Sequence, residues 1–149
     1  MLNETLADLY NQYIDKLRSE VESFPDDKSL WRSGGDIPNS AGNLTLHLIG
    51  NLNHFLGATI SKNGYVRDRD SEFSSGGISK DQLLGEIAKV KKVVNDGLRS
   101  VAENEMQKTY PVQFQDNDVS TEYVLVYLLG HLNYHLGQID YHRRLLARN

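Results

Sequence analysis

Apolar residues in the first part of the chain recur at intervals of three and four positions. Such spacing gathers apolar side chains on one face of an α-helix. The pattern begins at Leu2 and continues to Phe24, so it predicts a first helix over this range. The apolar positions that carry it are Leu2, Leu6, Leu9, Tyr10, Tyr13, Ile14, Leu17, Val21 and Phe24.

A second apolar segment follows a break rich in glycine and proline. Asn39 or Ser40 can cap its first turn, because short polar side chains accept hydrogen bonds from free backbone N–H groups. The segment predicts a helix that continues to about Ile60. Residues 61–78 then combine an Asn-Gly turn, alternating charges and a Ser/Gly cluster without an apolar period. We therefore expect a long loop there.

Two further helices are predicted in the second half of the chain. Ser79 and Gln82 have the spacing of a capping box, and the apolar period after them continues to near Glu103. Ser120 or Thr121 can cap a last helix that extends to the end of the chain. Alternation typical of strands is confined to a few residues between the third and last helices, which is too short for a sheet.

These elements predict an all-α protein, a four-helix bundle in a single domain over residues 1–149. A chain of this length can bury a sizeable core without disulfides. Connections between antiparallel neighbours in bundles are usually two to eight residues long, so the link over 61–78 is long enough to cross the bundle. We expect an up-down-down-up arrangement, with the crossover between helices two and three and with helices two and four antiparallel.

Composition and charge narrow the classes of function. The chain has no cysteine, which excludes disulfides, thiolate metal sites and a cysteine nucleophile. Its formal net charge of −4 gives no basic surface for a nucleic-acid backbone. The amino terminus lacks the basic start and apolar run of a signal peptide, and no apolar run has the length of a membrane span. We expect a cytoplasmic protein that binds neither nucleic acid nor membrane.

Histidines are the candidate metal ligands of this chain. His131 and His135, in GHLNYHLG, are four residues apart on the last helix, so their rings can face one point. His47, in LTLHLIGNLNHFLG, can add a third nitrogen from the second helix. Three nitrogen ligands leave coordination positions for water or substrate, as in catalytic metal sites. His54 and His142 are assigned to hydrogen bonding or an interface, outside this metal site.

The residues around these histidines exclude two familiar metal chemistries. Leu132 stands where the zinc-protease motif HExxH has its glutamate. Di-iron bundles require several glutamates, but the acids of helices two and four are Glu122 and Asp140. The catalytic residues are therefore left unassigned: a base would be ion-activated water or a substrate thiol or hydroxyl. Asn51 and Gln138 are candidates for orienting the ligands or the substrate.

The segment 61–78 also carries two arginines, Arg67 and Arg69, that alternate with aspartates. The simplest interpretation of this segment is a solvated connection. The alternative is a lid over a metal site, in which one of these arginines binds a substrate carboxylate.

The three-histidine pattern resembles that of the DinB-like family of metal-dependent four-helix proteins. The residues that carry the resemblance are His47 in LHLIGNLNHFLGA and the pair His131 and His135 in GHLNYHLGQIDYHRRLL. The resemblance extends over the whole chain and implies a crossed bundle that binds a divalent ion, zinc or nickel, through these residues. It also implies a homodimer. Some relatives are S-transferases and isomerases that activate a low-molecular-weight thiol.

Two functions remain open on the sequence alone. The first is a metal-dependent enzyme that activates water or a thiol for hydrolysis or group transfer on a small-molecule substrate. Three imidazoles would also accept iron or cobalt in place of zinc or nickel. The alternative is a non-catalytic dimeric bundle that acts as a binding or interaction module, with a structural or incidental metal. A solvent-open cavity beside the histidines would favour the enzyme.

Overall fold

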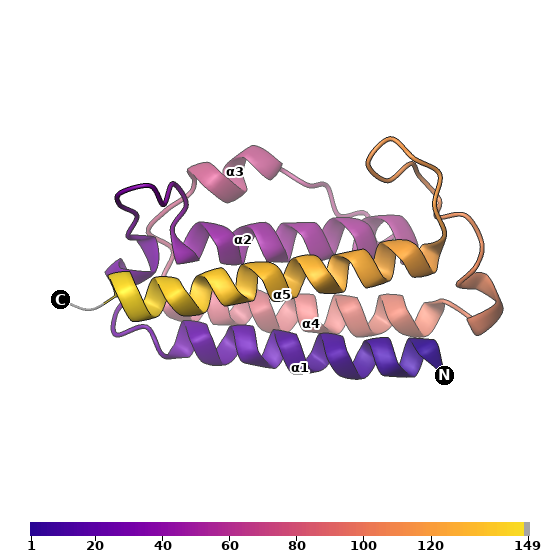
Figure 1. Cartoon of the computed structure of the whole chain (residues 1–149), viewed down its shortest axis with the longest axis horizontal. Helices are drawn as coiled ribbons and strands as arrows, with labels where there is room; N and C mark the ends of the chain where they lie inside the picture. Colours follow the sequence, from indigo (N-terminus) through magenta and orange to yellow (C-terminus); the bar gives the residue numbers. More distant parts are fainter. Residues whose placement is uncertain (148–149) are drawn as a thin grey trace.

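Helices and their connections make up residues 1–147, the part of the chain described by a computed structural model (Figure 1). Within these residues there are isolated β-bridges but no β-strand, so the all-α prediction is confirmed. Single 3₁₀ turns follow α1 and α4. The α-helices are α1 (Leu2–Glu22), α2 (Ala41–Leu52), α3 (Arg69–Ser74), α4 (Lys80–Ser100) and α5 (Thr121–Leu146), and a π-helix (Asn53–Ile60) extends α2.

Serine side chains cap three of the long helices at positions that the sequence indicated. Ser40 accepts a hydrogen bond from the backbone N–H of Asn43 at the start of α2. Ser79 and Gln82 form the predicted capping box at the start of α4. Ser120 caps α5 in the same manner as Ser40 caps α2. These caps fix where each helix begins, because they satisfy backbone N–H groups that have no partner within the helix.

The second helix changes its geometry where the sequence predicted continuous α-helix. The α-helical hydrogen bonding of α2 ends at Leu52, and a π-helix continues to Ile60. Its last bond joins the N–H of Ser61 to the carbonyl of Leu56 at 2.9 Å, five residues back. A π-helix is rare and usually only one turn long. Gly97 of α4 packs against this one, because the absence of a side chain lets the two helices lie close together at Leu56.

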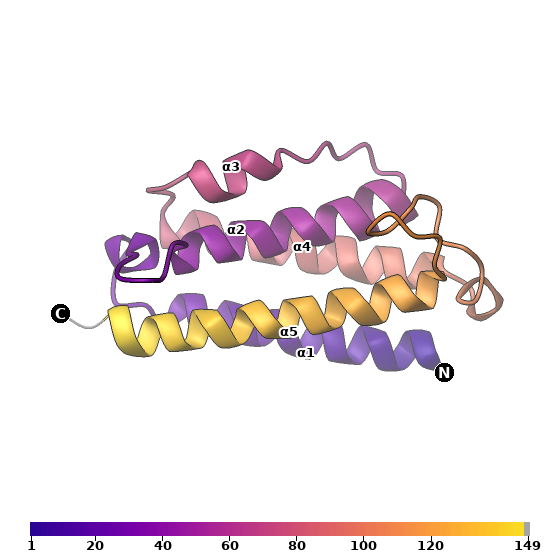
Figure 2. The ribbon, with the colours of Figure 1, turned by 45° about the horizontal axis from the view of Figure 1, so that its top comes forward.

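The segment 61–78, which we call the strap, is not entirely a loop. It contains α3, a single short helix that the sequence analysis missed because six residues are too few to show an apolar period. Asp68 caps α3 by accepting the N–H of Ser71. The strap lies along α2 (Figure 2). It is fastened there by Asn43, whose amide donates to the backbone carbonyls of Glu72 at 3.0 Å and Ser75 at 2.7 Å.

The four long helices lie side by side (Figures 1 and 2). The N–H of Leu2 bonds to Glu103, just beyond the end of α4, so α1 and α4 run in opposite directions. Arg143 pairs with Glu20 at 2.7 Å, which joins the carboxyl-terminal parts of α5 and α1. Figure 1 shows α2 running in the same direction as α4 and opposite to α5. The strap thus connects two parallel helices, and His47 and the α5 histidines belong to antiparallel helices.

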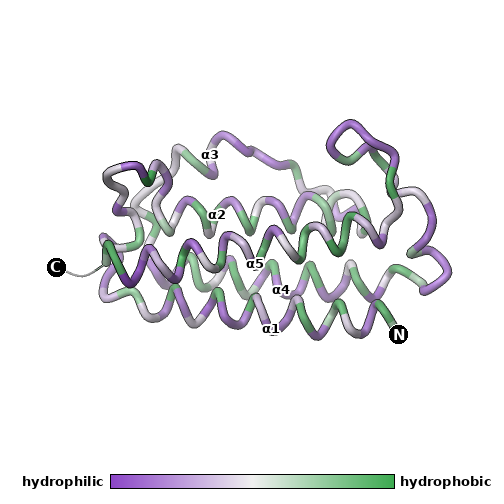
Figure 3. Tube along the Cα trace, viewed as in Figure 1, coloured by the Kyte–Doolittle hydropathy of each residue, from purple (hydrophilic) through white to green (hydrophobic). Residues whose placement is uncertain are grey.

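All four long helices contribute to one apolar core. Along each of them apolar and polar positions alternate with the helical period (Figure 3). Tyr10 has no exposed surface, and its hydroxyl donates to the carbonyl of Leu125 at 2.6 Å. The core therefore holds α2 and α5 in fixed positions, and these two helices carry the candidate site.

Among the described residues, no helix is both long and apolar enough to cross a membrane.

Candidate metal centre

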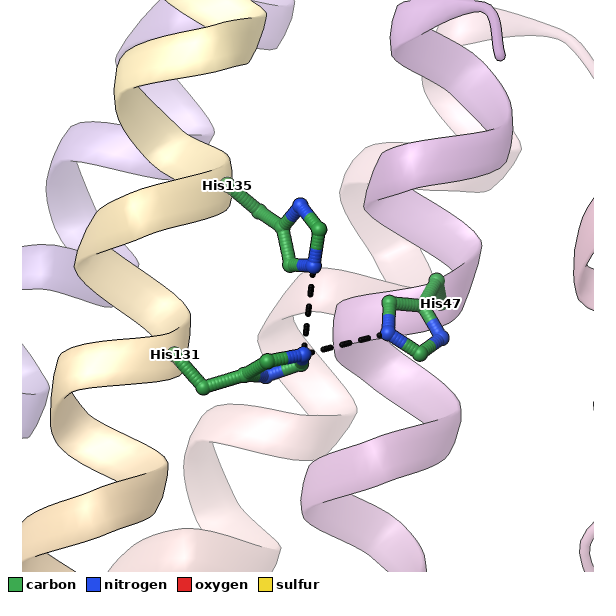
Figure 4. Close-up of side chains that lie close together, drawn as sticks. All are labelled: His47, His131 and His135. Carbon is green, nitrogen blue, oxygen red and sulfur yellow. Dashed lines mark hydrogen bonds between the residues drawn. The ribbon is translucent and has the colours of Figure 1, made fainter. Parts of the chain in front are cut away.

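Three histidine rings meet between α2 and α5 (Figure 4). The Nε2 atom of His131 lies 3.2 Å from that of His47 and 3.1 Å from that of His135. His131 and His135 are one turn apart on α5, while His47 faces them from α2. The structure therefore brings together the three histidines that the sequence singled out.

The spacing of these nitrogens suits one metal ion. The ligand atoms of His47, His131 and His135 all lie within 4.8 Å of one another. Two nitrogens bound at about 2.0–2.1 Å to an ion of tetrahedral geometry lie roughly 3.3 Å apart. The observed separations are close to this value, and imidazole nitrogen is a preferred ligand of zinc, nickel, cobalt and iron. The cluster can hold a metal ion.

A buried carboxylate from the strap holds the ring of His47. Glu72 Oε1 lies 3.0 Å from His47 Nδ1, and the Glu72 side chain is only 6% exposed. Arg67 donates to both carboxylate oxygens of Glu72, from Nε at 2.8 Å and from Nη2 at 2.9 Å. Because an ionised carboxylate only accepts hydrogen bonds, the proton of a neutral His47 belongs on Nδ1, and Nε2 keeps its lone pair.

A similar contact orients His135. Its Nδ1 lies 2.7 Å from the amide oxygen of Gln138, which assigns the proton of a neutral His135 to Nδ1. His135 and His47 then both direct lone pairs toward Nε2 of His131. That atom can donate only one proton, while Nδ1 of His131 is buried without a partner. A cation at the centre of the three rings would accept all three lone pairs.

Burial keeps two of these rings neutral. Desolvation lowers the pKa of His131 to about 4, and the neighbouring His135 and His47 add to this effect. Desolvation also lowers the pKa of His47, although the hydrogen bond to Glu72 acts in the opposite direction. At neutral pH His131 and His47 are therefore in the unprotonated form that binds metal ions.

A cavity of about 420 Å³ opens beside His47 and His131. We call it the arginine pocket. It lies between α2, the strap, the connection before α5, and α5 itself. The side-chain oxygen of Asn51 is buried on its wall and has no partner. The polar residues in its lining include His47, Asn51, His54, Arg67, Arg69 and His131.

A second cavity of about 390 Å³ opens on the other side of the cluster, beside His135. We call it the tyrosine pocket. Its walls come from α5, the start of α2 and the segment before it, and they are mostly apolar or aromatic. The three-histidine cluster is therefore accessible from two sides. The tyrosine pocket is lined by Ile37, Pro38, Asn39, Leu44, Tyr134, His135, Gln138, Tyr141, His142 and Leu145.

Glu72 and its pairing with Arg67 were not predicted from the sequence, because Glu72 lies in the strap and not on helices two and four, which carry the histidines. Glu72 reaches His47 from the strap, across Gly50 of α2. A Cβ atom at Gly50 would overlap the Glu72 carboxylate. A glycine one turn after a candidate ligand on the same helix, His47, is a signal that could have suggested a close approach.

The two remaining histidines, one in the π-helix and one in α5, do not join the cluster. His54 lies in the arginine pocket, and its ring packs edge-on against Phe55. His142 is buried near the start of α2, where it hydrogen bonds to the backbone of Asn39. Both therefore lie outside the group that can hold an ion.

The fold and the cluster define a class of protein: a helical bundle in which one histidine of α2 and an HxxxH pair of α5 can hold a metal ion. Within this class, the chain belongs to the family described as "Protein of unknown function (DUF1572)", and the match to this family covers residues 3–149. The family is a DinB-like one. The resemblance to DinB-like proteins noted from the sequence is thereby confirmed.

Solved structures support the same fold. The chain is similar to the crystal structure of a DinB-like protein from Bacillus cereus ATCC 10987, with a TM-score of 0.76 and 15% sequence identity. The similarity covers 95% of this chain and 90% of that one. Comparison with curated proteins gave no match. At this identity the likeness concerns the fold alone.

Proposed function

We propose that His47, His131 and His135 bind a divalent metal ion, and that the protein is a metal-dependent enzyme acting on a small molecule. The observation that carries the proposal is the convergence of three ring nitrogens at a point reached by two cavities, with Nε2 of His131 at 3.1–3.2 Å from Nε2 of the other two rings. A closed structural cluster would have no such access. Zinc or nickel suits the ligands best, with iron or cobalt as alternatives.

The ion would supply Lewis acidity, lowering the pKa of a water molecule or thiol so that it attacks as an anion in hydrolysis or group transfer. The protein's own residues prepare the site. Glu72 accepts the Nδ1 proton of His47 and so keeps the ring in the metal-binding tautomer. Gln138 does the same for His135. The arginine pocket provides room for the substrate next to His47 and His131.

A second candidate is a non-catalytic homodimer that acts as an interaction module. It is favoured by large side chains on the outer face of α5, which are between 41% and 67% exposed. This face would suit a second copy of the chain, and a dimer is compatible with either function. The two cavities beside the histidines favour the enzyme. The exposed residues are Tyr123, Val126, Tyr127, Tyr134, Tyr141 and Leu145.

Elemental analysis by plasma mass spectrometry tests the metal site directly. Untagged wild-type protein should contain about one divalent ion per chain, and His131→Ala should lose it. His54→Ala is the matched control, because it removes a histidine that lines the same cavity but lies outside the cluster. Far-ultraviolet circular dichroism should show that His131→Ala stays helical, since a bundle of this size does not need the ion to fold.

The outcomes separate the two functions. Metal in the wild type and in His54→Ala, but not in His131→Ala, would justify screening hydrolysis and the transfer of low-molecular-weight thiols. Wild-type protein that takes up no metal even after reconstitution would overturn the metalloenzyme proposal. Sedimentation analysis of the same sample would then show whether the interaction module exists as a dimer.

A further inference from the structure

The charged side chains that line the arginine pocket have one sign. Among the described residues they are Arg67 and Arg69, and no aspartate or glutamate lines this cavity. The whole chain, by contrast, carries a net charge of −4. A cavity whose fixed charges are positive attracts anions and repels cations, most strongly where low-dielectric walls limit screening. The lining of this pocket thus selects for a negatively charged ligand.

The two arginines are not equally available. Both oxygens of Glu72 accept from Arg67, so the half-buried arginine and the buried carboxylate form a locally neutral pair. Arg69 has no ion-pair partner among the described residues, and its guanidinium lies 5.2 Å from the centre of the Phe73 ring. Stacking of this kind orients a guanidinium while leaving its N–H donors free. Arg69 is therefore the cation that can pair with a ligand.

The alternating arginines and aspartates of the strap lie on different sides of it. Arg67 and Arg69 line the arginine pocket, whereas Asp68 caps α3 and lines a separate cavity between the strap and α4. Asp70 lines neither of these cavities. The acids that neighbour Arg69 in sequence therefore do not neutralise the arginine pocket.

We propose that the arginine pocket binds a small substrate through a carboxylate group, with Arg69 as its ion-pair partner, so that the substrate's reactive end reaches the three histidines. This inference rests on the proposed function and names the substrate class for the same site. One unpaired guanidinium matches the single charge and planar shape of a carboxylate. The volume of about 420 Å³ suits a small molecule.

Two features of the site agree with this assignment. The tyrosine pocket has no lysine or arginine in its described lining, so a charged group is better placed on the opposite side of the cluster. The buried oxygen of Asn51 has no partner in the arginine pocket. It offers an acceptor for a hydroxyl or N–H group of the same ligand, whose carboxylate would pair with Arg69.

A matched pair of thiols tests the carboxylate preference. Protein loaded with cobalt is titrated with 3-mercaptopropionate and with its neutral counterpart 3-mercapto-1-propanol, and the thiolate-to-cobalt absorption band gives both dissociation constants. We expect the carboxylate to bind about tenfold more tightly, as one charge-assisted ion pair implies. Because Arg69 is exposed, this preference should shrink as the salt concentration rises.

Variants of the strap identify the residue that causes the preference for the carboxylate. Arg69→Gln should bind the two thiols almost equally, and Arg69→Lys should keep part of the preference. Lys62→Gln is the control, because it removes a cation from the same strap at a position that lines a different cavity. Equal binding of the two thiols by the wild type, or a preference that survives in Arg69→Gln, would overturn the inference.

A protein that binds neither cobalt nor any other of the proposed metals would overturn the proposed function, and the inference would then be decided on the metal-free protein. The Nε–H nuclear magnetic resonance signal of Arg69, assigned with Arg69→Gln, should shift on addition of 3-mercaptopropionate but not of the alcohol. A signal that responds to neither compound would overturn the carboxylate site as well.

Discussion

Glu72 carries a charge that is buried but well compensated. A buried carboxylate is costly unless it is paired and hydrogen bonded. Here it receives two hydrogen bonds from Arg67 and one from His47, at 2.8–3.0 Å. In metalloproteins such a carboxylate makes the ligand ring more basic and fixes its orientation. The arrangement therefore gives Glu72 a positioning role, through His47.

Replacing Glu72 by glutamine tests this role. Glu72→Gln keeps the shape of the side chain but removes its charge, so we expect metal affinity to fall by about 10- to 100-fold. Competition with a metal-binding dye measures the change. Asp70→Asn, an exposed acid on the same short helix, is the control and should bind metal like the wild type. Unchanged affinity in Glu72→Gln would contradict the positioning role.

At the scale of elements, the strap and α2 fit together because α2 lacks a side chain at Gly50. A methyl group there would occupy the position of the Glu72 carboxylate. Asn43 fixes the strap to α2 a little further along. The contact between these two elements thus determines whether Glu72 reaches His47.

Gly50→Ala should therefore displace Glu72 and weaken metal binding, although alanine is the better helix former. Gly85→Ala in α4 is the matched control, because no atom lies within 4 Å of its added methyl group. It should stabilise the protein by about 0.5–1 kcal/mol without changing metal affinity. Urea unfolding and dye competition measure the two effects. If both variants bound metal like the wild type, the packing argument would be wrong.

The elements themselves could be predicted to different degrees. The long helices follow from apolar periods, and Ser40, Ser79 and Ser120 mark where three of them begin. The π-helix and α3 could not be predicted in this way. A π-helix depends on packing, as at Leu56 against Gly97, and α3 is held by tertiary contacts that local sequence does not contain.

At the scale of the whole molecule, buried histidines make stability depend on pH. His142 is 5% exposed and its Nε2 has no partner, so burial lowers its pKa in the folded state. The unfolded chain takes up a proton at about pH 6.5, before the folded state does. The free energy of unfolding should therefore fall as the pH drops below about 6.5, until the lowered pKa of the folded state is reached.

His142→Gln isolates this contribution, because the variant side chain does not titrate. Urea unfolding of metal-free protein should show the variant further below the wild type at pH 7.5 than at pH 5. The other buried histidines contribute equally to both proteins and cancel in this comparison. A difference between the two proteins that stays constant over this range would show that His142 is not held neutral by the fold.

Local sequence determined the long helices and the pairing of His131 with His135, because apolar periods and an i, i+4 spacing act within a few residues. It marked His47 as a candidate third ligand, but the packing of α2 against α5 brings His47 to this pair. Local sequence also placed Gln138 near His135, one turn away on the same helix. Only the tertiary structure decided that Glu72 contacts His47 and pairs with Arg67. It also decided that Arg69 lines an open cavity. These contacts join the strap to distant parts of the chain, and the packing of the whole bundle sets their geometry.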